Sequence, residues 1–181
     1  MKNWVVLFSR SGSEDKTINE LKGVLNNYGF LPFAPLKEKA QRNKGIITKK
    51  CERMFPGYIL LQTEIEPKQI TENLRLALRE NNLMEKRNIY SILHYGDDKQ
   101  DIVMHETERL QLERLLDDSF CVAGSVGFIE GDKIWITSGP LKGMESHIIK
   151  INRHKREATI EMEMMGAVRQ VQVMLEVVSK I

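Results

Sequence analysis

The residue types that most often carry catalysis or bind metals are few in this chain and are not spaced for either role. The 181 residues include four histidines and two cysteines, namely His94, His105, His147, His154, Cys51 and Cys121. None of them forms a CxxC or HExxH pattern, so the sequence predicts no metal site and no cofactor. The segment Gly139-Pro140-Leu141-Lys142-Gly143 lacks the length and the Lys-Ser/Thr ending of a phosphate-binding P-loop.

Cys51 is the one candidate nucleophile. It lies in Lys49-Lys50-Cys51-Glu52-Arg53, and flanking cations of this kind can activate a thiol without making it catalytic. A catalytic cysteine also needs a base placed beside it, and the sequence pattern supplies none. A hydrolase that uses Cys51 with one of the histidines is therefore the weakest alternative, and we expect the protein not to be an enzyme.

Positive charge is concentrated in two segments. Residues 37–53 hold seven Lys and Arg against two Glu, and residues 142–156 hold five against one Glu. The formal net charge of the chain is only +2, so a nucleic-acid role must come from this distribution and not from the total. Basic runs are commonly solvated loops. However, Arg153-His154-Lys155-Arg156 falls at a predicted hairpin turn, where its donors could converge on phosphate groups.

The elements that must position these residues follow two different patterns. Up to about residue 118, strand-like apolar runs alternate with segments of helical spacing. The predicted strands are Trp4–Phe8, Tyr58–Leu61 and Ile89–Leu93, and the predicted helices cover residues 18–28, the segment that starts at Pro67, and Thr107–Leu116. Helices packed on a mixed sheet with βαβ-type connections are the expected fold of this part.

From Gly131 onward the helical period disappears. Alternating apolar residues predict short strands around Ile134–Ile136, Ile149–Ile151, Ile160–Met164 and Val171–Leu175. Several short strands close together in the sequence are typical of a small β-barrel. We therefore expect an α+β protein with an α/β domain at residues 1–118, a linker at 119–129 and a barrel domain at 130–181.

The composition is that of a folded protein. The chain is 41% hydrophobic and 29% charged, which is enough apolar surface for real cores. No apolar run approaches the roughly 20 residues of a membrane span, and the apolar start is too short for a secretory signal. With so few cysteines, we expect a reduced, cytoplasmic protein that contacts no membrane.

Sequence motifs occur in a characteristic order along nearly the whole chain. They are Trp4-Val5-Val6, Gly12, Glu14, Pro35, the segment 52–60 with Phe55-Pro56-Gly57-Tyr58, the segment 130–134, and the segment 136–145 with Gly139, Pro140 and Gly143. The last of these matches the KOW motif. Taken together, the motifs resemble those of the bacterial NusG-type transcription elongation factors.

This resemblance implies an N-terminal α/β domain of the NGN type followed by a five-stranded KOW β-barrel. It also implies that the N-terminal domain binds the β′ clamp helices of RNA polymerase through an aromatic surface. The residues that correspond to that surface are Trp4, Phe55, Pro56 and Tyr58. We expect Trp4 to pack in the core, whereas Phe55, beside a Pro-Gly turn, is the best candidate for exposure. By analogy with the family, binding across the DNA cleft would hold the clamp closed and suppress pausing.

Departures from the housekeeping pattern shift the expected partner toward RNA. Housekeeping members carry barrel aromatics that bind the Rho terminator or a small-subunit ribosomal protein, whereas this chain has Leu141, Met144 and Met165 there. Ser146 and His147 stand where a KOW glycine is expected, and the basic turn is atypical. These features resemble the LoaP antitermination group. The RNA contacts expected on this basis are Lys142, His147, Lys150, Arg153, His154, Lys155 and Arg156.

Three hypotheses of function follow. The first is a monomeric antiterminator that binds RNA polymerase and nascent RNA, with upstream or non-template DNA as a further contact. The second is a general NusG that couples polymerase to Rho or the ribosome. The third is a ribosome-associated KOW protein that binds RNA, against which the Phe55-Pro56-Gly57-Tyr58 segment and the α/β half both argue.

Overall fold

The computed structural model describes residues 2–86 and 89–180, and the chain divides into two compact units. The first unit comprises the residues up to Ala34 together with Phe55–Arg109. The second comprises Pro35–Met54 together with the chain from Leu110 onward. Within the described residues, no helix has the length and apolar character that crossing a lipid bilayer requires.

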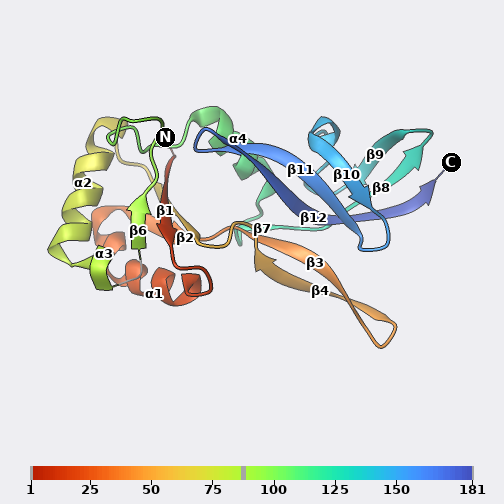
Figure 1. The fold of residues 1–181 in the computed structure, drawn as a ribbon, viewed down its shortest axis with the longest axis horizontal. Coiled ribbons are helices and arrows are strands. Elements are labelled where there is room, and N and C mark those ends of the chain that lie inside the picture. Colours follow the sequence, from red (N-terminus) through yellow and green to blue (C-terminus); the bar gives the residue numbers. More distant parts are fainter. Residues whose placement is uncertain (1, 87–88, 181) are drawn as a thin grey trace. The chain divides into compact units, whose positions relative to one another are not determined.

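The first unit is built on a four-stranded antiparallel sheet (Figure 1). Its strands run in the order β2 (Phe30–Phe33), β5 (Tyr58–Thr63), β1 (Asn3–Ser9) and β6 (Ile89–Ile92). Because β1 and β2 are both antiparallel to β5, they run parallel to each other with β5 inserted between them. The predicted βαβ connections are therefore present in split form, as in ferredoxin-like folds.

The helices of this unit bury one apolar face each. They are α1 (Glu14–Leu25), α2 (Pro67–Glu80) and the short α3 (Leu83–Lys86), with a 3₁₀ turn η1 (Asn26–Tyr28) after α1. Apolar residues recur every three or four positions on α1 and α2, so each helix presents a continuous stripe to the sheet. The resulting core includes Leu21, Leu25, Ile70, Leu74, Val5, Leu7, Ile59 and Leu61. Each such fully buried side chain contributes about 1.5–3 kcal/mol of transfer free energy.

A buried carboxylate joins the loop before α1 to the turn before β5. Glu14 Oε2 accepts a hydrogen bond from the Gly12 backbone N–H, and its Oε1 accepts one from the Gly57 N–H, both at 2.7 Å. Gly57 has a φ of +85°, and a Cβ there would lie 2.9 Å from Ser11 Oγ. The Ser9 N–H also donates to the Gly57 carbonyl at 2.7 Å. These contacts fix where β5 begins relative to β1.

The second unit contains a β-hairpin and a larger sheet. The hairpin consists of β3 (Leu36–Asn43) and β4 (Ile46–Arg53), and the short β7 (Cys121–Val122) pairs in parallel with the start of β3. The segment 37–53, which the sequence marked only as basic, is thus a regular hairpin. Helix α4 (Glu106–Leu115) agrees with the predicted helix at Thr107–Leu116 and spans the point where the two units divide.

The larger sheet has five strands, of which the alternating apolar pattern predicts four. They are β10 (Ile148–Asn152), β11 (Glu157–Met164), β12 (Ala167–Lys180), β8 (Ser125–Glu130) and β9 (Lys133–Ser138), in that spatial order. In the part of the chain that the structure describes, β10 and β9 are the edges and do not pair, so the predicted barrel is not seen as a closed sheet. The predicted linker at 119–129 contains β7 and most of β8.

Polar contacts attach the hairpin to the rest of the second unit. The Glu38 carboxylate accepts hydrogen bonds from Lys49 Nζ at 2.8 Å and from the Gly124 N–H at 2.7 Å. Lys37, which is buried, donates from Nζ to the Gln172 carbonyl of β12 at 2.7 Å. Charged groups make stronger hydrogen bonds than neutral ones, so these contacts hold β3 firmly against β12 and the β7–β8 segment.

Replacing Glu14 by Gln tests the hydrogen bonds that join Glu14 to the backbone of Gly12 and Gly57. The amide retains only one acceptor oxygen, so one of the two glycine N–H groups loses its partner, and we expect the free energy of unfolding to fall by about 1.5–3 kcal/mol. Chemical denaturation measures this change. The exposed Glu72 of α2 provides the control, because Glu72→Gln should stay within about 0.5 kcal/mol. Equal stability of the Glu14 and Glu72 variants would contradict the role given to Glu14.

The Glu38 contacts predict a dependence of stability on pH. The hydrogen bond from Lys49, and after it that from Gly124, hold the pKa of Glu38 below its ordinary value of 4.5, against the opposing effect of burial. A lowered pKa in the folded state gives a stabilisation that is complete above pH 4.5 and is lost as the pH falls through the folded pKa. Glu38→Gln should therefore lose stability at neutral pH and show a flatter decline between about pH 5 and pH 3.

Unfolding curves across this pH range provide the measurement. Glu130→Gln is the matched control, because Glu130 lies exposed at the end of β8 in the same unit. The control should keep the wild-type pH profile. A Glu38→Gln profile that runs parallel to that of the wild type would exclude Glu38 as a source of the acid sensitivity.

Candidate functional site

Three aromatic side chains form an exposed cluster on the first unit. Phe8 lies opposite Tyr58 in the β1–β5 register, and β6 on the other side of β1 carries Tyr90. The Phe8 ring centroid is 5.5 Å from that of Tyr58 and 5.5 Å from that of Tyr90. Both distances are in the range of favourable aromatic pairs. Phe8 is 37% exposed and Tyr90 59%, so the cluster presents a continuous aromatic surface to solvent.

The structure separates the four residues predicted to contact polymerase. Trp4 is only 1% exposed and packs edge-on against Phe33, with ring centroids 5.3 Å apart, as expected for a core residue. Phe55 is 6% exposed, so the expectation that it is the exposed member of the set is wrong. The turn that follows Phe55, closed by the hydrogen bond from the Tyr58 N–H to the Phe55 carbonyl, leaves Pro56 exposed and Tyr58 half-buried.

Two members of the aromatic surface were missed in the sequence. Phe8 was predicted only as part of an apolar strand, although Leu7 is buried and Phe8 follows it on the other face near the strand end. Tyr90 follows the buried Ile89 in β6. The alternation of side chains along a strand could have indicated that Tyr90 faces away from Ile89, because successive residues point to opposite faces.

The basic turn joins β10 to β11 as predicted. Arg153, His154 and Lys155 are exposed, whereas Arg156 forms an ion pair with Glu176 at 2.9 Å. The turn is closed by hydrogen bonds from the Lys155 N–H to Asn152 Oδ1 and from the Arg156 N–H to the Arg153 carbonyl. The side chains of the first three residues are therefore held on one short, well-defined turn.

The other predicted RNA contacts lie on separate segments. Lys142 and His147 belong to the connection between β9 and β10, and Lys150 is an exposed residue of β10 itself. The carbonyl of Lys142 accepts a hydrogen bond from Arg114 Nη2 at 3.0 Å. None of these three side chains lines the concave surface beside the basic turn.

The Gly139-Pro140 motif has a structural role. Gly139 has a φ of +94°, and a Cβ there would lie 2.6 Å from Ser125 Cα and 2.8 Å from the Gly124 carbonyl, so only glycine fits. The next turn is anchored by the Leu141 N–H, which donates to Ser125 Oγ at 3.1 Å. Leu141, Met144 and Met165, at the positions where aromatics were expected, are all buried. These aliphatic side chains therefore pack inside the second unit and do not form a docking surface.

The thiols of the two cysteines lie next to each other. Cys51 Sγ lies 3.8 Å from Cys121 Sγ. Burial, and then the hydrogen bond with Cys51, raise the pKa of the Cys121 thiol to about 12, so this thiol stays protonated at neutral pH. Among the described residues, no three His, Cys, Asp or Glu side chains come together as a group that could hold a metal ion.

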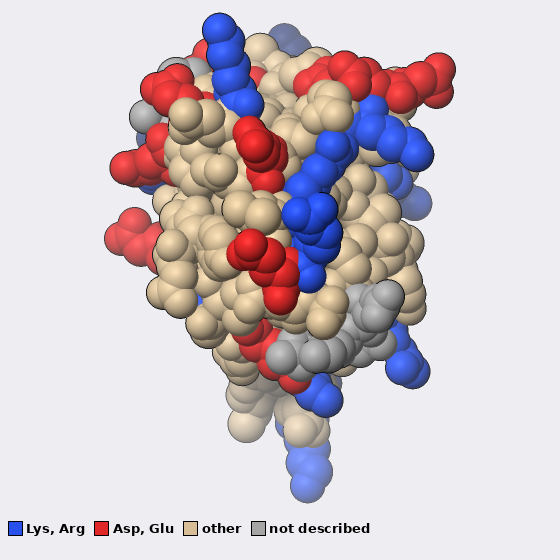
Figure 2. Space-filling view, turned by 90° about the vertical axis from the view of Figure 1, so that its left-hand side faces the viewer, with Lys and Arg blue, Asp and Glu red and all other residues tan. Residues whose placement is uncertain are grey.

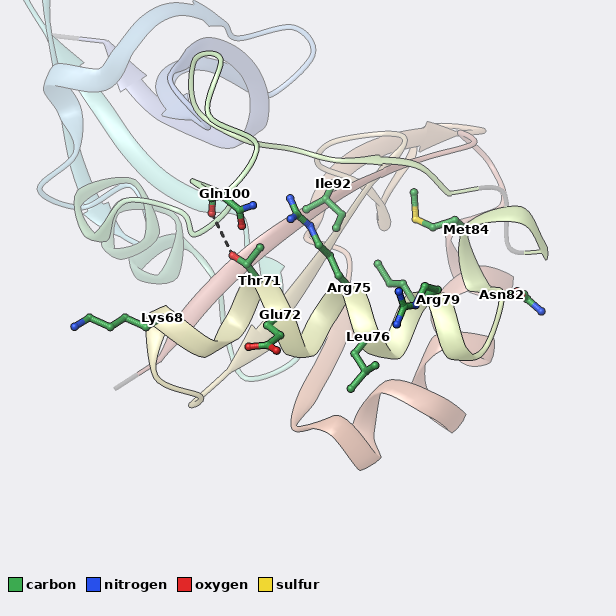
Figure 3. A pocket seen from close by; sticks show the side chains of 11 residues that line it. Lys68, Thr71, Glu72, Arg75, Leu76, Arg79, Asn82, Met84, Ile92 and Gln100 are labelled. Carbon is green, nitrogen blue, oxygen red and sulfur yellow. Dashed lines mark hydrogen bonds between the residues drawn. The ribbon is translucent and has the colours of Figure 1, made fainter.

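A further concave surface, of about 910 Å³, lies beside α2 in the first unit (Figure 3). Arg75 Nη2 donates to the Lys99 carbonyl at 2.6 Å, and Thr71 Oγ1 donates to the Gln100 carbonyl at 3.2 Å. These two side chains thus hold the loop that follows β6 against the helix. Figure 2, turned toward the side of the molecule on which α2 lies in Figure 1, shows a row of Lys and Arg flanked by Asp and Glu. Charge of both signs on this face does not favour a particular ligand.

A family model matches the N-terminal part of the chain. Residues 2–112 match the family model described as "NusG: Transcription termination factor nusG". No curated protein sequence matches the chain. A solved structure described as "Domain interaction in Thermotoga maritima NusG" is 15% identical, with 98% of this chain and 94% of that chain covered and a TM-score of 0.47.

A second structure, described as "Crystal Structure of MjSpt4:Spt5 complex conformation A", is 11% identical. It covers 98% of this chain and 99% of that chain, with a TM-score of 0.30. The segment that matches the family contains the split βαβ sheet, the hydrogen bonds of Glu14 and the exposed aromatic surface. Because this segment makes up more than half of the 181 residues, the chain belongs to the NusG family.

Proposed function

We propose that this protein is a transcription elongation factor that binds the β′ clamp helices of RNA polymerase through its first unit and promotes processive antitermination. Proteins of the NusG family are transcription factors and not enzymes, and homologues bind RNA polymerase. The observation that carries the proposal is the exposed cluster of Phe8, Tyr58 and Tyr90. Exposed apolar surface of this kind marks an interaction site in a folded protein.

The composition of the cluster suits a protein partner. Tyr and Trp are the residues that most often dominate binding energy at interfaces, because they bury large areas at a small cost in side-chain entropy. Here the rings are braced against one another across three adjacent strands, so little ordering is needed on binding. Occupancy of the clamp by such a surface would hold it closed and suppress pausing, with no substrate consumed.

Removing two rings tests this surface. The double variant Phe8→Ala/Tyr90→Ala should weaken binding to core RNA polymerase by about 2 kcal/mol or more, because central aromatic residues are typical hot spots. Equilibrium binding of the labelled full-length chain measures the change. The control is Leu31→Ala, which removes an apolar side chain of similar exposure, 38%, from strand β2.

Phe55→Ala separates binding from stability. Since Phe55 is buried, its truncation should lower the free energy of unfolding by about 3–5 kcal/mol, and molecules that remain folded should keep their affinity for polymerase. If the Phe8/Tyr90 variant binds polymerase like the wild type, the aromatic cluster is not the polymerase surface.

The second unit is proposed to act as a KOW-type module that contacts nascent RNA. The support is the exposed basic turn at Arg153, His154 and Lys155, which offers donors to phosphates from one rigid position. The alternative, a general NusG that couples polymerase to Rho or the ribosome, finds less support. The positions where housekeeping members carry exposed aromatics hold buried side chains here, at Leu141 and Met144. We therefore favour the LoaP-like function, with Lys142, His147 and Lys150 as additional contacts.

The double variant Arg153→Ala/Lys155→Ala tests the RNA contact. It leaves the Arg156–Glu176 ion pair intact, and the full-length chain should lose about two units from the slope of log affinity for an RNA stem–loop against log salt. Fluorescence anisotropy at several salt concentrations provides the measurement. Lys133→Ala, which removes an exposed lysine at the start of β9, next to the β8–β9 turn, is the control. An unchanged affinity and slope in the double variant would mean that the turn does not touch RNA.

A further inference from the structure

A basic groove runs between the β3–β4 hairpin and the β10–β11 turn, both within the second unit. Its volume is about 550 Å³. Ten residues line it, namely Lys39, Ala40, Gln41, Arg42, Ile47, Arg153, His154, Lys155, Arg156 and Glu157. The two walls come from segments more than a hundred residues apart in the sequence, and they unite the two basic segments of the chain in one surface.

The groove has fixed walls. On the hairpin side, the Lys37 ammonium is bound to the Gln172 carbonyl, and Glu38 is bound to the Gly124 N–H. Across the groove, Lys39 Nζ lies 3.7 Å from the Glu157 carboxylate. The turn is held by the ion pair between Arg156 and Glu176. A ligand would therefore meet a surface that is already organised, which lowers the entropy lost on binding.

The charge of the groove selects for an anion. Five of the ten lining residues are Lys or Arg, His154 adds a further donor, and Glu157 is the only acid. Lys39 faces both Glu157 and Glu52 of the hairpin, each at 3.7 Å, so these charges compensate one another locally. Arg42, Arg153 and Lys155 are exposed and carry charge that the groove does not compensate with a second acid. Several cations along a concave surface are the arrangement that follows a phosphate backbone.

The other lining groups distinguish unpaired RNA from a duplex. Guanidinium and imidazole groups can stack on the faces of unstacked bases, and Arg42, Arg153 and His154 supply them here. Ile47, which is 41% exposed, adds an apolar contact on the hairpin wall. A paired helix hides its base faces and offers only phosphates and groove edges, so it would leave these groups unused.

We propose that the β3–β4 hairpin and the β10–β11 turn together bind one unpaired RNA segment, with Arg42 of the hairpin as a direct contact. This proposal rests on the proposed function and deepens it, because it adds a second wall to the RNA site of the basic turn. The hairpin is then an RNA-binding element, and recognition requires residues from both basic segments of the chain.

The test measures binding of the full-length chain to a fluorescein-labelled RNA stem–loop with an unpaired loop. Arg42→Ala should weaken binding about tenfold and lower the salt slope by about one. The matched control is Lys50→Ala, which removes one positive charge from the same hairpin but does not line the groove, and it should change the affinity far less. Equal effects of the two variants would contradict the groove as the RNA site, because they would reflect only the total charge of the protein.

Two further ligands test the chemistry of the site. A fully paired RNA of the same length should bind more weakly than the stem–loop, and equal binding would overturn the selection of unpaired bases. A DNA stem–loop of the same sequence should also bind more weakly, and tighter binding would assign the groove to DNA. In both cases the wild-type chain and the Arg42→Ala variant are compared at the same salt concentration.

Photo-cross-linking tests directly whether the RNA lies in the groove. Ile47→p-benzoylphenylalanine should cross-link to the labelled stem–loop on irradiation, whereas the same residue in place of Trp135, which is exposed on β9, should not. If Arg153→Ala/Lys155→Ala lowers affinity while Arg42→Ala and the Ile47 cross-link show nothing, the proposed function stands and the two-walled groove is wrong. If none of the variants lowers affinity, the RNA contact of the basic turn and the two-walled groove are both contradicted.

Discussion

The carboxylate of Glu14 is the contact on which the aromatic surface depends. By accepting hydrogen bonds from Gly12 and Gly57 at once, it holds the first loop of the chain against the turn that begins β5. That turn sets the register in which Tyr58 faces Phe8 across the sheet. A buried carboxylate with two backbone donors is well satisfied, whereas the Gly57 N–H without it would be buried and unpaired. The arrangement of the aromatic surface thus depends on one buried side chain, that of Glu14.

The sequence predicted the elements of the fold better than their exposure. Apolar periodicity located β1, β5, α1, α2 and four of the five strands of the larger sheet, because burial of one face is a local property of the pattern, whereas β8 fell in the predicted linker. The sequence did not show which aromatic residue faces solvent. Phe55 and Tyr58 lie three positions apart in one motif, yet one is buried and the other reaches the surface. That difference arises from a turn and from strand order, which are properties of the whole sheet.

In the second unit, the sequence likewise predicted where charged residues lie in the chain but not which of them share a surface. The basic turn at Arg153 was found because hairpin turns have local signals. The groove was not found, since it requires knowing that residues 37–53 form a hairpin and that Lys37 fixes it to β12. The buried aliphatic residues at Leu141 and Met144 were likewise noted as departures from the family without their reason, which is packing beneath a glycine turn that approaches Ser125 closely.

The division of the chain has a consequence for how the protein can be cut. The polypeptide passes from one compact unit to the other three times, after Ala34, after Met54 and within α4. A fragment that ends near residue 118 would carry the hairpin but not β12, so the Lys37 ammonium would lose the Gln172 carbonyl and keep only Glu52, which lies 3.3 Å away in the hairpin itself. Truncation of the gene at a single point therefore cannot yield both units intact, because the hairpin must be deleted from the first unit and fused through a linker to the segment that begins at Leu110.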